Sequence, residues 1–177
     1  MVFKASLVTS RQQAHCLLTR IFDTLGEFGR GEECKLFAEV ERLVVNGRRK
    51  KAPHVSGQRF ASFVSGLFRH ESIECMLKLR VSRERRATVD TAIGPRETTL
   101  LSGVTVQAKL SIYRDSASVE LECYGFADER LPPEEHADAV SRARATIATV
   151  ESLVRETEAR EALIRAVDSN LQTLRER

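Results

Sequence analysis

The stretch PPEEHADAVSRARATIATVESLVRETEAREALIRAVDSNLQTLRER, residues 132–177, decides how this chain is organised. Pro132 and Pro133 open it, Glu134 and Glu135 follow, and the rest of the stretch contains neither Pro nor Gly. Proline is tolerated at the first helical position, and acidic side chains there complement the helix dipole. The stretch therefore predicts one uninterrupted helix of about 44 residues, roughly 65 Å long at about 1.5 Å per residue.

Apolar side chains recur along this helix at alternating spacings of three and four, which indicates a coiled-coil seam. The pattern breaks after Thr157, where Arg160 or Glu161 occupies a core position, and it resumes at Ile164. A skipped position of this kind is typical of a stutter. We predict that the seam serves oligomerisation or partner binding through Val140, Ile147, Val150, Val154, Ile164, Val167, Leu171 and Leu174.

An alternative for the same helix is that it packs across a sheet of its own chain and pairs with no other molecule. Small and β-branched side chains such as Val, Ala and Ile suit a sheet as well as a second helix. Residues 164–174 would overhang a head of this size, so the sequence favours intermolecular pairing for these last turns.

Length and composition indicate a folded globular protein. The chain has 177 residues, of which 42% are hydrophobic and 30% charged, and this length can bury a sizeable core. We expect a head domain over residues 1–130 and the long helix over 131–177. No apolar run approaches the ~18 residues of a membrane span, so we predict no membrane partner. The net charge of +3 is too small to prove a nucleic-acid partner.

Cysteine and histidine usage excludes several kinds of site. The histidines are dispersed, and no C-x-x-C pair occurs, so we predict no metal site and no cofactor. The chain shows no secretory signal, which favours reduced thiols and an intracellular location, cytoplasmic or nuclear. Residues 1–22 carry basic but no acidic side chains, which leaves mitochondrial import open. The thiols expected to be reduced and buried are Cys16, Cys34, Cys75 and Cys123.

The N-terminal part of the chain predicts a strand followed by helices. Residues 2–8 alternate as a short strand with one apolar face. Ser10 and Gln13 have the spacing of a capping box before an amphipathic helix that ends among Gly26, Gly29 and Gly31. Residues 56–69 predict another helix. Residues 32–46 fit either a helix or two strands, and the lack of a turn residue between the two strands favours the helix.

Residues 73–123 change to a period of two, which predicts strands. The alternating segments are 73–81, 87–93, 104–112 and 119–123, with short polar or glycine-containing connections between them. Four successive strands with short connections form an antiparallel meander. The predicted fold class is therefore α+β, with N-terminal helices packed on a four-stranded antiparallel meander and followed by the long C-terminal helix.

Signatures of catalysis are absent from the sequence. It contains no phosphate-binding glycine loop and no nucleophile elbow, so we predict that the protein is not an enzyme. Two basic clusters could contact phosphate groups, although each can also be a solvated loop. They comprise Arg48, Arg49, Lys50 and Lys51 in the first cluster, and Arg83, Arg85 and Arg86 in the second.

Two likenesses to known families concern parts of the chain. The segments MVFKASLV, LTRI and CKLFAEVERLVV, between Met1 and Val45, look like the start of a checkpoint sliding-clamp subunit. That likeness implies a strand–helix–strands unit repeated in the chain, whereas only one such unit fits here. The order of a small head and a long helix is similar to head-and-coiled-coil scaffold proteins of DNA repair and centrioles, whose heads begin with strands. Neither likeness is taken as a family assignment.

The sequence thus favours a non-enzymatic assembly or scaffold protein. In this hypothesis the head binds protein partners, and the C-terminal helix self-associates or pairs with another helix. The alternative is a nucleic-acid-associated subunit, sliding-clamp-like in one version, that contacts phosphates through the two basic clusters.

Overall fold

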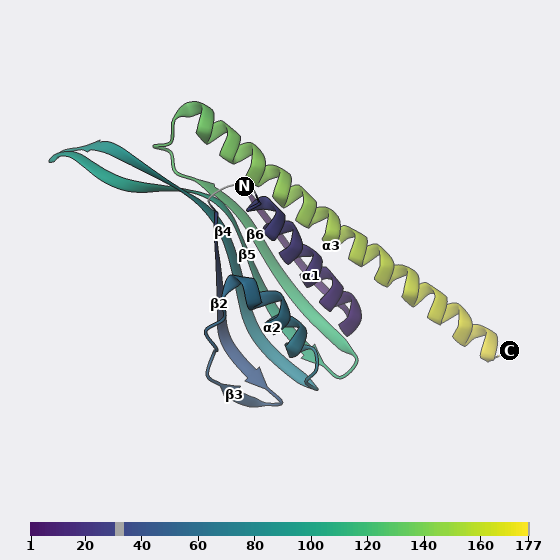
Figure 1. The fold of residues 1–177 in the computed structure, drawn as a ribbon. Helices are drawn as coiled ribbons and strands as arrows, with labels where there is room; N and C mark the ends of the chain where they lie inside the picture. The colour runs from purple at the N-terminus through teal and green to yellow at the C-terminus, as the bar shows by residue number, and fades with distance from the viewer. Residues whose placement is uncertain (31–33, 177) are drawn as a thin grey trace.

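The computed structural model describes residues 1–30 and 34–176. Within these residues six antiparallel strands form one sheet in the order β1-β6-β5-β4-β2-β3. Three helices lie on one face of this sheet, and we call the opposite face the open face (Figure 1). The elements are β1 (Val2–Ser10), α1 (Arg11–Phe28), β2 (Cys34–Val45), β3 (Arg48–Lys50), the 3-10 turn η1 (Gly57–Arg59), α2 (Phe60–Leu67), β4 (Ser72–Thr91), β5 (Gly94–Tyr113), β6 (Ser116–Ala127) and α3 (Pro133–Arg175).

The predicted α+β class with a long C-terminal helix is confirmed, but the predicted arrangement of N-terminal helices on a four-stranded meander is wrong. In the described residues the sheet has six strands, and two short α-helices precede α3. β1 joins the sheet by pairing with β6, so the first and last strands of the chain are neighbours. A pairing between residues so far apart leaves no local signal in the sequence.

The first two predicted strands of the meander are one strand, β4. Residues 83–86 were expected to form a basic turn, but they continue the ladder with β5, where Arg83 pairs with Ser102 and Arg86 with Thr99. The β4–β5 hairpin extends beyond the rest of the sheet as a two-stranded arm (Figure 1). Most of the side chains of the arm are exposed, so the polar sequence there reflects solvent on both faces rather than a turn.

The favoured helix over residues 32–46 is also wrong, because residues 34–45 form β2; residues 32 and 33 lie outside the described residues. Arg42 has a φ of 48°, and the register with β4 shifts between Glu41 and Val44. This bulge changes which residues face the core: Val40 is buried before it, and Leu43 is buried after it. Because of the bulge, the buried residues on either side of it are three positions apart instead of two. A spacing of three is also typical of a helix, so the sequence pattern favoured the wrong structure.

The predicted helix after Ser10 is confirmed as α1, and one half of the predicted capping box forms. The helix begins after Ser10, whose hydroxyl accepts a hydrogen bond from the backbone N–H of Gln13. Its inward face buries Leu17, Leu18 and Ile21 in the core. This core is continuous with the buried residues of the sheet and of the first half of α3, including Ala143 and Val150.

Candidate protein–protein interface

The second half of α3 extends past the body of the molecule. The last buried residue of the helix is Glu161, and every residue from 162 to 176 is exposed. We call residues 162–175 the overhang (Figure 1). Its apolar side chains remain in contact with solvent: Ile164 is 43% exposed, Val167 49%, Leu171 49% and Leu174 67%.

The structure divides the eight predicted seam residues into two groups. Ile147, Val150 and Val154 are buried in the molecule's own core, and Val140 is half-buried. This half of α3 packs on α1, β1, β5 and β6. The remaining four form the apolar stripe of the overhang: Ile164, Val167, Leu171 and Leu174.

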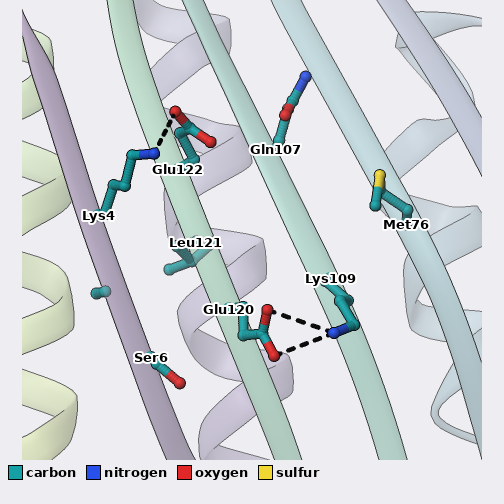
Figure 2. A pocket seen from close by; sticks show the side chains of 9 residues that line it. Lys4, Ser6, Met76, Gln107, Lys109, Glu120, Leu121 and Glu122 are labelled. Atoms are coloured by element: carbon teal, nitrogen blue, oxygen red, sulfur yellow. Dashed lines mark hydrogen bonds and ion pairs between the residues drawn. The ribbon is translucent and has the colours of Figure 1, made fainter.

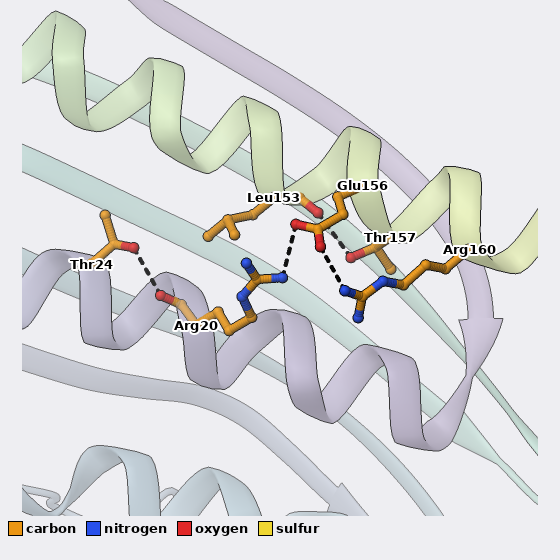
Figure 3. Close-up of polar contacts among 6 residues, drawn as sticks. All are labelled: Arg20, Thr24, Leu153, Glu156, Thr157 and Arg160. Atoms are coloured by element: carbon orange, nitrogen blue, oxygen red, sulfur yellow. Dashed lines mark hydrogen bonds and ion pairs between the residues drawn. The ribbon is translucent and has the colours of Figure 1, made fainter.

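Polar contacts fasten α3 to α1 just before the overhang begins. Nη1 of Arg20 in α1 donates to Oε2 of Glu156 at 2.9 Å, and Nη2 of Arg160 donates to the other carboxylate oxygen at 2.6 Å. Figure 3 shows this bridge beside Leu153, which lies between the two helices. The hydroxyl of Thr157 donates to the carbonyl of Leu153 at 2.9 Å, so this buried hydroxyl is satisfied within α3.

The interruption of the seam at Glu161 has a structural cause. Glu161 is 8% exposed, and its Oε1 accepts a hydrogen bond of 2.7 Å from the backbone N–H of Ser10. One turn later, Nη2 of Arg165 donates to the carbonyl of Val8 at 3.0 Å. The two side chains thus bind backbone groups where β1 passes into α1, and the carboxylate lies where the dipole of α1 favours negative charge. Sequence reasoning detected the irregular position but could not find its partner.

A shallow depression on the open face has a volume of about 510 Å³ (Figure 2). Its charged groups are paired across neighbouring strands, with Lys4 at 3.1 Å from Glu122 and Lys109 at 3.2 Å from Glu120. Gln107, Met76 and Ser6 also line it. Paired surface charges and a thioether offer recognition by hydrogen bonding and packing.

Next to this depression, one residue on each of five neighbouring strands contributes to a row that crosses the open face. The ladder registers place these residues directly opposite one another on successive strands. Val2 is 61% exposed and Phe37 52%. Arginine and aromatic side chains carry much of the binding energy in protein interfaces. The row consists of Val2, Tyr124, Thr105, Arg80 and Phe37, of which Thr105 is buried.

The two basic clusters lie at opposite ends of β2. Arg48, Arg49 and Lys50 form the exposed strand β3 rather than a loop, and Lys51 follows it. Residue 48 pairs with Val45 at one end of β2, whereas residue 83 pairs with Cys34 at the other. About 11 strand residues separate them, or roughly 35 Å. Arg85 also forms an ion pair with Glu135, and Arg86 is exposed on the arm. The described residues therefore do not combine both clusters into one basic surface.

The thiols fall into two environments. Burial raises the pKa of Cys75 and of Cys123 to about 12, because a thiolate would lose its hydration there. Both thiols therefore stay protonated near neutral pH and act as small core residues. Cys16 is exposed on α1. Among the described residues, no group of three His, Cys, Asp or Glu side chains is placed to hold a metal ion.

Comparisons with protein-family models, with curated proteins and with solved structures found no match to this chain. Neither family likeness seen in the sequence gains support from them. None of the helices in residues 1–30 and 34–176 combines the length and the apolar character needed to cross a bilayer.

Proposed function

We propose that this protein is a non-enzymatic assembly protein that pairs through the overhang of α3 and binds a further protein through the open face of its sheet. The observation that carries the proposal is the apolar stripe of the overhang. Four aliphatic side chains at heptad spacing are exposed on a helix whose first half is packed in the core. Such a stripe is typical of a helix that packs against another helix.

Pre-ordering of the helix lowers the entropic cost of pairing. An isolated helix as short as the overhang is marginally stable in water, because forming its first turn is unfavourable. Here the overhang continues a helix whose first half is packed in the core. Burying the exposed half of a Leu, Ile or Val side chain contributes about 1 kcal/mol. Since association costs at least about 4 kcal/mol, four such side chains per molecule predict weak, concentration-dependent pairing.

The open face supports the second part of the proposal. Each of its strands carries alternating side chains, and the core-facing set is covered by the helices. At the two ends of the row Val2 and Phe37 leave apolar and aromatic surface uncovered. Cross-strand ion pairs such as Lys4 with Glu122 lie beside the row. Apolar and aromatic side chains together with polar groups are what protein interfaces contain.

The test of pairing is the solution mass, measured by light scattering over a range of protein concentrations. The full chain is expected to show a mass that rises with concentration. The variant Val167→Glu/Leu171→Glu places charges on the stripe and should remain a monomer. A matched variant, Ala166→Glu/Thr173→Glu, adds the same charges at exposed positions off the stripe and should pair like the full chain.

A chain that ends at Arg165 provides a second test. It keeps the buried half of α3 and the contacts of Glu161 and Arg165, so it should fold with unchanged circular dichroism per helical residue. We expect it to be a monomer at every concentration. A full chain that is monomeric under all conditions would contradict self-association and direct the search to a helix of another protein.

A further inference from the structure

The exposed stripe of the overhang continues two heptad columns that begin inside the molecule. Residues seven apart on a helix lie within about 20° of the same direction. The first column is Val150, Thr157, Ile164 and Leu171, and the second is Leu153, Arg160, Val167 and Leu174. The upstream members Val150, Leu153 and Thr157 are buried against the molecule's own body, whereas the members from Ile164 onward are exposed. Leu153 and Arg160 of the second column lie on the side of α3 that faces α1, where Arg160 shares the Glu156 carboxylate with Arg20 (Figure 3). The stripe therefore points to the side of α3 on which α1 lies.

α1 occupies this side up to the point where the overhang starts. Ser10, at the beginning of α1, contacts Glu161, and Arg20 further along contacts Glu156. Residue numbers thus rise along α1 as they fall along α3, so the two helices are antiparallel where they pack (Figure 3). Beyond Glu161 every described residue of α3 is exposed, so the stripe lies uncovered on the side that α1 covers earlier along the helix.

We propose that the overhang of a second copy of this chain packs on this uncovered stripe, antiparallel to the first overhang. This inference rests on the proposed self-association and specifies its geometry. In the pair, the C-terminal end of each α3 meets the N-terminal end of α1 of the other copy. These two helices then run in the same direction, one after the other. A parallel, in-register partner is excluded, because its residues before Arg160 would have to occupy the space of α1.

Side-chain sizes fit the antiparallel arrangement. A two-fold axis at the level of Ser169 places Ile164 opposite Leu174 of the second copy, and Val167 opposite Leu171 of the second copy. Every layer then combines one β-branched side chain with one leucine, so the layers are similar in volume. Such a contact is the same on both copies, as a closed two-fold dimer requires.

Charges also permit a second copy as the occupant. From residue 162 to 176 the chain has two arginines, one aspartate and one glutamate, so two overhangs do not repel each other. The C-terminal carbonyl groups of the second copy's α3 face the N-terminal end of α1. Opposite ends of two helix dipoles thus meet, which is the favourable order.

Distances between spin labels test this geometry in the full chain. The exposed thiol is removed by Cys16→Ser and the half-buried one by Cys34→Ser, and a nitroxide is attached at Ser152→Cys or at Ser169→Cys. Both serines are exposed on α3. Double electron–electron resonance is recorded at concentrations where light scattering shows pairs. The antiparallel arrangement places the two Ser169 sites at the same axial level. It separates the two Ser152 sites by roughly 51 Å along the axis, twice 17 residues at about 1.5 Å.

Three results separate this inference from the proposed function. A short distance at Ser169 with a long distance at Ser152 supports the antiparallel pair. Equal distances at the two sites, or long distances at both, in a sample that is dimeric by mass would overturn the geometry and leave self-association standing. A monomeric mass with no intermolecular distance at either site would overturn both.

Discussion

The backbone N–H of Ser10 donates to Oε1 of Glu161 at 2.7 Å, although 151 positions separate the two residues in the chain. Ser10 caps α1 through its hydroxyl, which accepts from Gln13, so the residue that begins α1 is itself held by α3. In a capping box the third residue of the helix would bind the N-cap N–H. Here a glutamate of another helix supplies that acceptor.

Substitution of Glu161 is expected to destabilise the whole domain. Glu161→Ala leaves the N–H of Ser10 without its acceptor in a part-buried position, which costs about 1–3 kcal/mol. Glu161→Gln keeps an acceptor oxygen and should cost less. The free energy of unfolding in urea measures the loss, and Glu158→Ala, at an exposed position of the same helix, serves as the control. Equal stability of Glu161→Ala and Glu158→Ala would show that the contact contributes nothing.

Arg11 is expected to be more important than its position at the surface suggests. Its guanidinium donates to four backbone carbonyls, which tie the start of α1 to the end of α2 and to the β5–β6 turn. Lysine cannot reproduce this set, because its three N–H donors are on a single nitrogen, whereas Nη1 and Nη2 of Arg11 each reach a different pair of carbonyls. Arg11→Lys should therefore lower the free energy of unfolding by about 2 kcal/mol, measured by urea denaturation. Arg69→Lys, at an exposed position, is the control, and a similar small effect for both would refute the prediction.

Gly103 is expected to tolerate no side chain. A Cβ at this position of β5 would lie 2.0 Å from the carbonyl oxygen of Val81 and 3.0 Å from the ring of Phe126. The same ring carries the guanidinium of Arg80, 4.4 Å from its centroid, so the ring cannot shift without losing that contact. Gly103→Ala should cost about 3 kcal/mol in the free energy of unfolding.

The matched control for this substitution is Gly26→Ala in α1. Nothing lies within 4 Å of a Cβ built at Gly26. Alanine is a better helix former than glycine, so this variant should gain about 0.5–1 kcal/mol. Thermal unfolding of the two variants side by side checks the contrast, and a loss of stability at both positions would mean that the helix effect is outweighed by another contact.

The buried thiols are expected to make stability depend on alkaline pH. Folding raises the pKa of Cys75 and of Cys123 from about 9 to about 12. Below about pH 9 the two thiols are protonated in the folded and in the unfolded state, so the free energy of unfolding keeps its full value. As the pH rises from 9 towards 12, the thiols of the unfolded state alone lose their protons, and the free energy of unfolding falls. Urea unfolding of the wild type and of Cys75→Ala/Cys123→Ala should show a steeper loss in the wild type over this range.

Thiol labelling provides an independent check of the same environments. Near neutral pH an alkylating reagent should modify Cys16 quickly, because this thiol is exposed on α1. Cys75 and Cys123 should react only after denaturant is added. Mass spectrometry of the labelled peptides distinguishes the sites. Rapid labelling of either buried thiol in the native protein would show that the core opens more readily than the structure implies.

Local sequence patterns predicted those elements whose signals are short in range. The two prolines and the absence of glycine predicted α3 as one helix, and the structure has it from Pro133 to Arg175. Ser10 and the apolar stripe after it predicted α1, and alternation predicted β1, β5 and β6. Caps and periodicity depend on neighbours within a few positions, so they can be read without knowledge of the fold.

Other features could not be predicted, because partners distant in the chain decide them. Arg42 inserts a bulge in β2, and the polar run through Arg86 continues β4, because each segment pairs with another strand. At the candidate interface, too, local spacing was readable from the sequence but burial was not. Heptad spacing alone proposed Val150 and Ile164 as equivalent seam residues, whereas the structure buries the first and exposes the second. The sequence determined that α3 would be long and apolar along one stripe. Only the tertiary structure decided where the body ends, because that limit depends on how far β1 and α1 extend alongside α3.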